Sequence, residues 1–81
     1  MEREPIRSRS LVSVGYDPDT KELDVEFRSG AVYRYENVPA AFHVALLEGK
    51  SPGRFFAYHI RDAFPWTALE PPRPAGPAYF G

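Results

Sequence analysis

Cysteine is absent from this chain of 81 residues. Its absence excludes a disulfide framework, a thiolate zinc site and a cysteine nucleophile, and it is compatible with a cytoplasmic location. No apolar run approaches the roughly 18 residues that a membrane-spanning helix needs, and the amino end is charged, unlike a signal peptide. We therefore expect a soluble cytoplasmic protein that makes no use of a membrane.

The chain also lacks an excess of charge of either sign. Its 10 lysines and arginines against 11 acids give a net charge of −1, so no global field attracts nucleic acid. The charges are nevertheless segregated, because residues 50–61 carry three cations and no acid, whereas acids concentrate in residues 17–26. Any affinity for nucleic acid must come from such a local patch.

The composition indicates one small folded domain. A hydrophobic fraction of 43% and an aromatic fraction of 15% are globular values, and a chain of this length holds a single core. We expect a basic amino-terminal arm over residues 1–9, a domain over 10–66 and a proline-rich tail over 67–81. The prolines of the tail disfavour regular structure, although Tyr79 and Phe80 could dock elsewhere.

Alternation of apolar and polar residues predicts three strands. The first lies at 11–16 around Val12, Val14 and Tyr16, and turn-forming residues follow at 17–20. Leu23, Val25 and Phe27 then alternate with charged residues, which is typical of a strand with one buried face. A third strand at 32–35 is rich in β-branched and aromatic residues. The prediction is a three-stranded antiparallel meander.

The loop between the second and third strands decides where Tyr33 and Tyr35 point. A two-residue loop would place Arg34 on the apolar face and both tyrosines outside. A three-residue loop, ending on Gly30 in the left-handed conformation, would instead place Arg34 opposite Asp24 on the outer face. We prefer the longer loop because it gives one apolar face and one charged face, which makes the tyrosines mainly core.

Two short helices are predicted after the meander. The first opens at Val38 with a proline in its first turn and ends at Gly49. The second has Ser51 as N-cap and Pro52 in its first position, and it runs to about Phe64. The fold is therefore α+β, with both helices packed on one face of the meander. The expected core consists of Leu23, Val25, Phe27, Tyr33, Tyr35, Phe42, Leu46, Phe56 and Ile60.

The second helix carries the candidate binding site. Arg54, Tyr58 and Arg61 fall at i, i+4 and i+7, so they share one face that is rotated away from Phe56, and Lys50 lies just before the helix. Arginine pairs with phosphate, tyrosine stacks on unpaired bases, and a helix amino terminus favours anions. The pattern predicts weak binding of RNA, either single-stranded or a tRNA loop; the alternative is an ordinary solvated helix face.

No residue pattern indicates catalysis. His43 and His59 lie on different predicted helices, and neither has an acid or a serine at a diagnostic spacing. We expect no enzyme activity, no cofactor and no metal site. An alternative function is that of a protein-interaction adaptor, which would use an edge of the small sheet or the proline-rich tail.

Several short motifs together resemble the KTSC domain, a family named after the C-terminus of some lysyl-tRNA synthetases. The resemblance covers roughly residues 8–66 and rests on the segments 14–17, 33–35, 51–56, 60–61 and 64–66. The family's Tyr-x-Tyr motif falls on Tyr33 and Tyr35, and its small-residue turn falls on Ser51 and Gly53. The biochemical role of the family is not established, and the resemblance implies a small binding module for which RNA is the usual suggestion.

Overall fold

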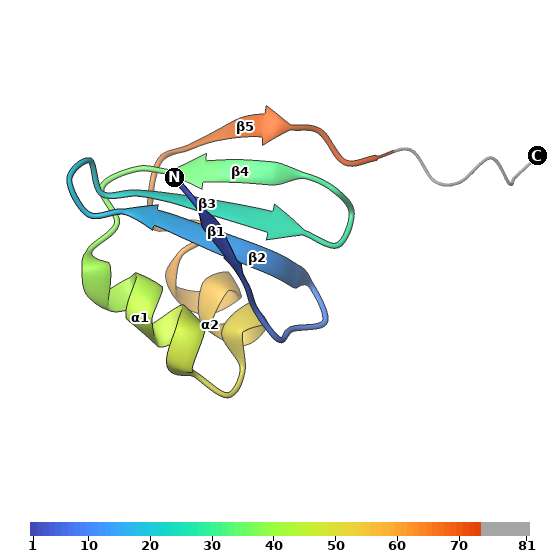
Figure 1. Ribbon diagram of the computed structural model, residues 1–81, viewed down its shortest axis with the longest axis horizontal. Coiled ribbons are helices and arrows are strands. Elements are labelled where there is room, and N and C mark those ends of the chain that lie inside the picture. The colour runs from blue at the N-terminus through green and yellow to red at the C-terminus, as the bar shows by residue number, and fades with distance from the viewer. Residues whose placement is uncertain (74–81) are drawn as a thin grey trace, which may run out of the picture.

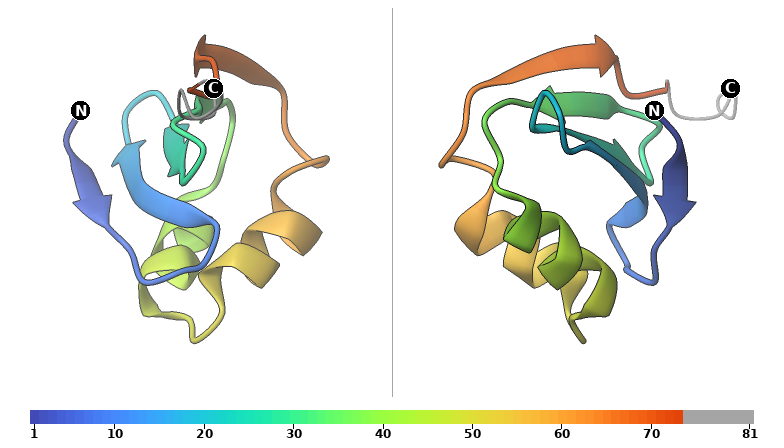
Figure 2. Two further views of the ribbon diagram at one scale, coloured as in Figure 1. Left: turned by 90° about the vertical axis from the view of Figure 1, so that its right-hand side faces the viewer. Right: turned by 60° about the vertical axis from the view of Figure 1, so that its left-hand side comes forward.

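The computed structural model describes residues 1–73, in which two helices cover one face of a five-stranded antiparallel sheet (Figure 1). The strands are adjacent in their order along the chain: β1 (Arg3–Pro5), β2 (Leu11–Asp17), β3 (Glu22–Phe27), β4 (Val32–Tyr35) and β5 (Trp66–Glu70). The helices α1 (Ala40–Glu48) and α2 (Pro52–His59) connect β4 to β5, and further views place both on the same side of the sheet (Figure 2). The α+β prediction is confirmed, but three strands were too few.

The two additional strands are the edges of the sheet. Strand β1 pairs with β2 within the segment expected to be an arm, and β5 pairs with β4 beyond the point where regular structure was expected to stop. All residues of both strands are exposed, so neither shows the alternation that marks a half-buried strand. Strands β1 and β5 form through backbone hydrogen bonds to a neighbouring strand, and such bonds leave no alternation of side chains from which they could be predicted.

The predicted β3–β4 register is confirmed. Leu23 faces Tyr35 and Val25 faces Tyr33, while Gly30 has a φ of +93°, the left-handed conformation that the three-residue loop requires. On the outer face, the Arg34 guanidinium donates two hydrogen bonds to Asp24, at 2.8 and 2.9 Å. This pairing raises the pKa of Arg34 despite partial burial.

Strand β2 departs from the expected alternation. The predicted alternation around Val12, Val14 and Tyr16 is interrupted by a bulge between Leu11 and Ser13, and Leu11 is fully buried opposite Phe27. Ser13 then points to the outer face, where its hydroxyl donates to a carboxylate oxygen of Glu26 at 2.8 Å.

The second helix is shorter than predicted. It ends at His59 instead of Phe64, because Ile60 leaves the helical conformation at a φ of −120° and the N–H groups of Ile60 and Arg61 both bond to the carbonyl of Phe56. The first helix ends before Gly49, as expected, although Gly49 is extended and not left-handed. Neither described helix is long and apolar enough to cross a membrane.

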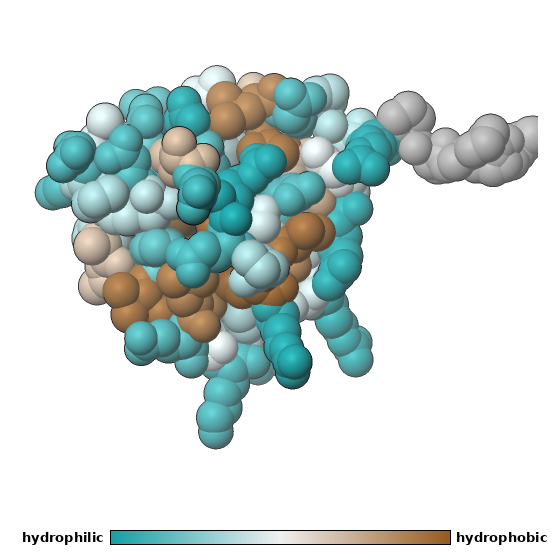
Figure 3. Space-filling view, viewed as in Figure 1, coloured by the Kyte–Doolittle hydropathy of each residue, from teal (hydrophilic) through white to brown (hydrophobic). Residues whose placement is uncertain are grey.

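The core lies between the sheet and the helices. Of the expected core residues, Leu23, Val25, Tyr35, Leu46, Phe56 and Ile60 are buried, and Phe27, Tyr33 and Phe42 pack against them while partly exposed. On the surface, apolar atoms gather over α1 and over β5, with hydrophilic side chains between them in front of β1 (Figure 3). The exposed apolar side chains include Val44 on α1 and Leu69 on β5.

Candidate nucleic-acid interface

A groove lined by four cationic side chains lies between the β1–β2 loop and the start of α2. It has a volume of about 480 Å³ and no acidic residue in its lining. We call it the basic groove. It is lined by Arg7, Ser8, Arg9, Ser10, Lys50, Ser51, Pro52, Gly53 and Arg54. Guanidinium, ammonium and hydroxyl groups are the donors that bind phosphate oxygens in proteins, so the lining suits an anionic backbone.

Close approach of the β1–β2 loop to α2 shapes this groove. A Cβ atom on Gly53 would lie 2.8 Å from the hydroxyl of Ser10 and 3.0 Å from that of Ser8, so a larger residue would force these hydroxyls to shift. The Ser8 hydroxyl also accepts hydrogen bonds from the N–H groups of Ser10 and Leu11, both at 3.2 Å, which holds the loop in a tight turn. Gly53 therefore sets the distance between the arginines of the loop and the cations of α2.

The start of α2 adds donors to the same groove. Its N-cap, Ser51, makes no side-chain capping hydrogen bond, and Pro52 has no N–H. The N–H groups of Gly53 and Arg54 belong to the first helical turn, which has no intrahelical acceptors for them. Together with the helix dipole they favour an anion here.

The structure divides the predicted binding stripe. Lys50 and Arg54 line the basic groove. Tyr58 lies one turn further along α2, is 75% exposed and does not line the groove. The prediction that Arg61 shares their face and turns away from Phe56 was wrong. Because α2 ends at His59, the Arg61 guanidinium instead lies 6.0 Å from the centre of the Phe56 ring.

Sequence reasoning missed Arg7 and Arg9 as partners of this site. Both arginines had been assigned to the amino-terminal arm, and only the pairing of β1 with β2 carries them to α2. The alternation of arginine and serine over residues 7–10 was the available signal, since it is unusual for a strand connection and offers donors at every position.

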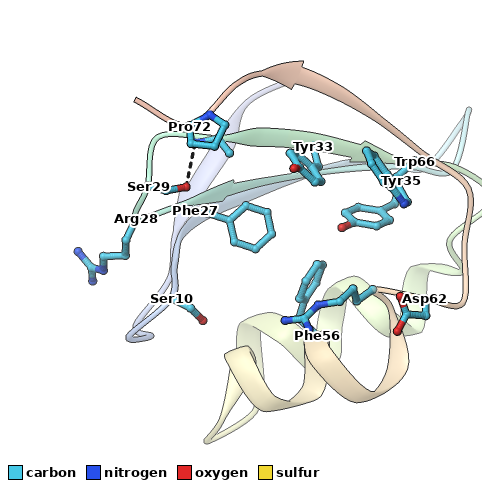
Figure 4. Close-up of a pocket in the computed structure, with 12 residues that line it drawn as sticks. Ser10, Phe27, Arg28, Ser29, Tyr33, Tyr35, Phe56, Asp62, Trp66 and Pro72 are labelled. Carbon is cyan, nitrogen blue, oxygen red and sulfur yellow. Dashed lines mark hydrogen bonds between the residues drawn. The ribbon is translucent and has the colours of Figure 1, made fainter. Parts of the chain in front are cut away.

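A second hollow, the aromatic pocket, lies between the sheet and α2. Its volume is about 570 Å³, within the usual range for small-molecule sites. Phe27, Tyr33, Tyr35 and Trp66 extend from the strands and Phe56 rises from α2 to meet them (Figure 4). The rest of the lining is Ser10, Arg28, Ser29, Ala31, Arg61, Asp62 and Pro72.

The rings of the aromatic pocket support one another. Phe56 meets Phe27 and Tyr35 edge to face, with centroids 5.3 and 5.4 Å apart, and Tyr33 stacks on Trp66 at 4.9 Å. The pKa of Tyr35 is raised to about 12, mainly by burial; the neighbouring Tyr33 and Asp62 also raise it, and Arg61 opposes them. The Tyr35 hydroxyl therefore keeps its proton to a higher pH than an ordinary tyrosine does.

The two histidines have ordinary packing partners. His43 stacks on Tyr16 with ring centroids 5.0 Å apart, and exposed His59 lies against Phe55 at 4.7 Å. Within residues 1–73, no group of three or more histidines, cysteines and acids is placed to hold a metal ion.

Comparisons with known proteins relate this chain to one family. The KTSC domain family model matches residues 7–64. A solved KTSC domain protein from Yersinia pestis is 35% identical, with a TM-score of 0.82 over 85% of this chain and 97% of that one. An uncharacterized protein from Stutzerimonas stutzeri is 55% identical over 69% of this chain and 79% of its own length. A lysine–tRNA ligase from Nostoc is 35% identical over 67% of this chain, which corresponds to 10% of the ligase.

Proposed function

The chain belongs to the KTSC domain family, and we propose that it is a non-catalytic module that binds single-stranded RNA through the basic groove. The observation that carries the proposal is the convergence of Arg7 and Arg9 with Lys50 and Arg54 in a groove whose lining contains no acid. These pairs come from segments far apart in the sequence, and their convergence gives a nearly neutral protein one cationic groove.

The arrangement of donors suits a phosphate backbone. Arginine binds phosphate with paired N–H groups, and the first amides of α2 add donors directed into the same groove. Tyr58, on the turn after Arg54 and 75% exposed, offers a face on which a base can stack. Positioning of the strand by phosphate contacts implies binding with little sequence preference.

The name of one relative motivates the choice of RNA as the ligand. One region that is 35% identical to this chain lies within a protein named lysine–tRNA ligase. A small module attached to such an enzyme could add affinity for tRNA without taking part in its chemistry, which agrees with the cationic groove described here.

Fluorescence anisotropy with labelled single-stranded RNA tests this function. If four cations each neutralise one phosphate, log K should fall against log salt with a slope of about −3, from roughly 0.7 per phosphate on a single strand. Arg54→Glu should abolish binding at moderate salt. Lys21→Glu is the matched control, since it makes the same charge change at an exposed position that lines neither hollow. Equal loss in both variants would leave only a nonspecific charge effect and would overturn the proposal.

Strand β5 favours a second function, protein binding by addition of a strand. It is an edge of the sheet, all of its residues are exposed, and Leu69 is 40% exposed on it. A photo-crosslinking residue at Leu69 should then trap one defined protein, and the same residue at Val44 on α1, which is 46% exposed, should not. Identical crosslinking patterns from both positions would count against an adaptor role.

A further inference from the structure

We infer that the aromatic pocket receives an unstacked nucleobase from the same strand whose phosphates lie along the basic groove. This inference rests on the proposed RNA binding and adds a second site to it. It assigns a role to the aromatic rings that the basic groove does not use.

The two hollows adjoin each other. Ser10 belongs to the lining of both, so it lies at the boundary between the basic groove and the aromatic pocket. Arg28, at the same end of the pocket, donates a hydrogen bond from its guanidinium to the carbonyl of Ser8 at 2.9 Å and so connects the two linings directly. A strand lying over the β1–β2 loop can therefore turn one base toward the rings without leaving the cations.

The walls of the aromatic pocket suit a planar, partly polar ligand. Exposed Trp66 is held nearly parallel to Tyr33, with an angle of 9° between the ring planes, so the pair presents flat π surfaces of the kind on which bases stack. Phe27 and Phe56 supply apolar walls that would exclude water from a bound ring. The combination of flat rings and a wide opening favours a base over a bulky aliphatic group.

The rim of the pocket supplies what a base edge requires. Within the lining, Arg61 offers donors and Asp62 offers acceptors, and each base carries both kinds of group on its edge. Asp62 lies at the end of the pocket opposite Ser10 (Figure 4), and the Arg61 guanidinium lies 6.0 Å from the centre of the Phe56 ring. An aromatic side chain of a peptide would fill the walls but would leave this pair and the four neighbouring cations without a role.

The test compares an ordinary labelled oligouridine with an abasic oligomer of the same length and charge. The chain has a single tryptophan, Trp66, whose emission reports directly on the pocket. We expect oligouridine to bind about five- to 150-fold more tightly than the abasic oligomer and to quench Trp66, as base stacking on an aromatic ring implies. The abasic oligomer should bind through the groove alone and leave the emission unchanged.

A pair of variants isolates the pocket. Tyr33→Leu removes the ring that supports Trp66 but keeps an apolar side chain. It should abolish the quenching of Trp66 and lower oligouridine affinity toward that of the abasic oligomer, with any remaining difference due to stacking on Tyr58. Phe64→Leu, an equivalent loss of a ring outside both hollows, should leave both affinities unchanged. Circular dichroism and thermal melting of each variant establish that it is folded at the assay temperature.

The outcomes separate the two proposals. Absence of binding by both oligomers overturns the proposed function and the base site with it. Equal binding of both oligomers with no change in Trp66 emission overturns the base site alone and leaves the phosphate-binding groove. Quenching of Trp66 by an aromatic peptide, together with equal affinity for the two oligomers, assigns the pocket to a peptide and equally overturns the inference.

Discussion

Tyr33 and Trp66 stack with their ring centroids 4.9 Å apart. They occupy diagonal positions on adjacent strands, since Trp66 pairs with Tyr35 while Tyr33 pairs with Ala68. Diagonal cross-strand neighbours of this size are within contact distance in an antiparallel sheet. The stack therefore attaches the exposed strand β5 to β4 and builds one wall of the aromatic pocket at the same time.

A double-mutant cycle should measure this stack. Tyr33→Leu and Trp66→Leu, singly and together, should show a coupling free energy of about 0.5–1.5 kcal/mol in urea unfolding, because each variant removes the same ring–ring contact. The control cycle pairs Tyr33→Leu with Leu69→Ala, since Leu69 lies on β5 as Trp66 does. The free-energy changes of these two variants should be additive. Additivity of the Tyr33 and Trp66 changes would show that β5 is held by its backbone alone.

Replacement of Phe56 should remove much of the domain's stability. Phe56 is 2% exposed and contacts two aromatic rings of the sheet, so Phe56→Ala should cost roughly 3–5 kcal/mol, comparable with the whole stability of a small domain. Tyr58→Ala, on the exposed face of the same helix, should change the unfolding free energy by no more than about 0.5 kcal/mol. Chemical denaturation with circular dichroism compares the two, and similar midpoints would contradict the core assignment.

The Asp24–Arg34 pair should respond asymmetrically to mutation. The Asp24 side chain is 8% exposed, whereas that of Arg34 is 35% exposed. Arg34→Ala leaves a buried carboxylate without its two hydrogen bonds and should cost about 2–3 kcal/mol. Asp24→Ala leaves an arginine that water can reach and should cost less. Urea unfolding of both variants measures the difference, and a larger loss for Asp24→Ala would contradict this account.

Alkaline pH should destabilise the protein through Tyr35. Burial raises the pKa of Tyr35 from 10.0 to about 12 in the folded chain, so between these values the unfolded chain loses a proton that the folded chain keeps. The contribution of Tyr35 to the free energy of unfolding is about 2–3 kcal/mol. It is fully present below pH 10 and is lost as the pH rises toward 12. Urea midpoints measured over this interval should fall for the wild type. In the Tyr35→Phe variant the urea midpoint should fall less between pH 10 and 12. Parallel curves for the two proteins would refute the assignment to Tyr35.

The inner part of the fold could be predicted from local patterns. Alternating residues such as Leu23 and Val25 mark a half-buried strand wherever they occur, and Gly30 fits a three-residue loop that brings Arg34 opposite Asp24. The bulge in β2 could not be predicted, because whether Leu11 or Val12 points inward depends on how that strand fits the hydrogen bonds of β3.

The sequence by itself determined the family, the central meander and its register, and the cations at the start of α2, because each rests on residues close together in the chain. Only the tertiary structure decided that β1 and β5 complete the sheet, that Arg7 and Arg9 join Lys50 and Arg54, and that Trp66 meets Tyr33. The physical reason is that edge strands form by backbone pairing, which is nearly independent of side-chain type, and the two hollows exist only where that pairing brings distant segments together.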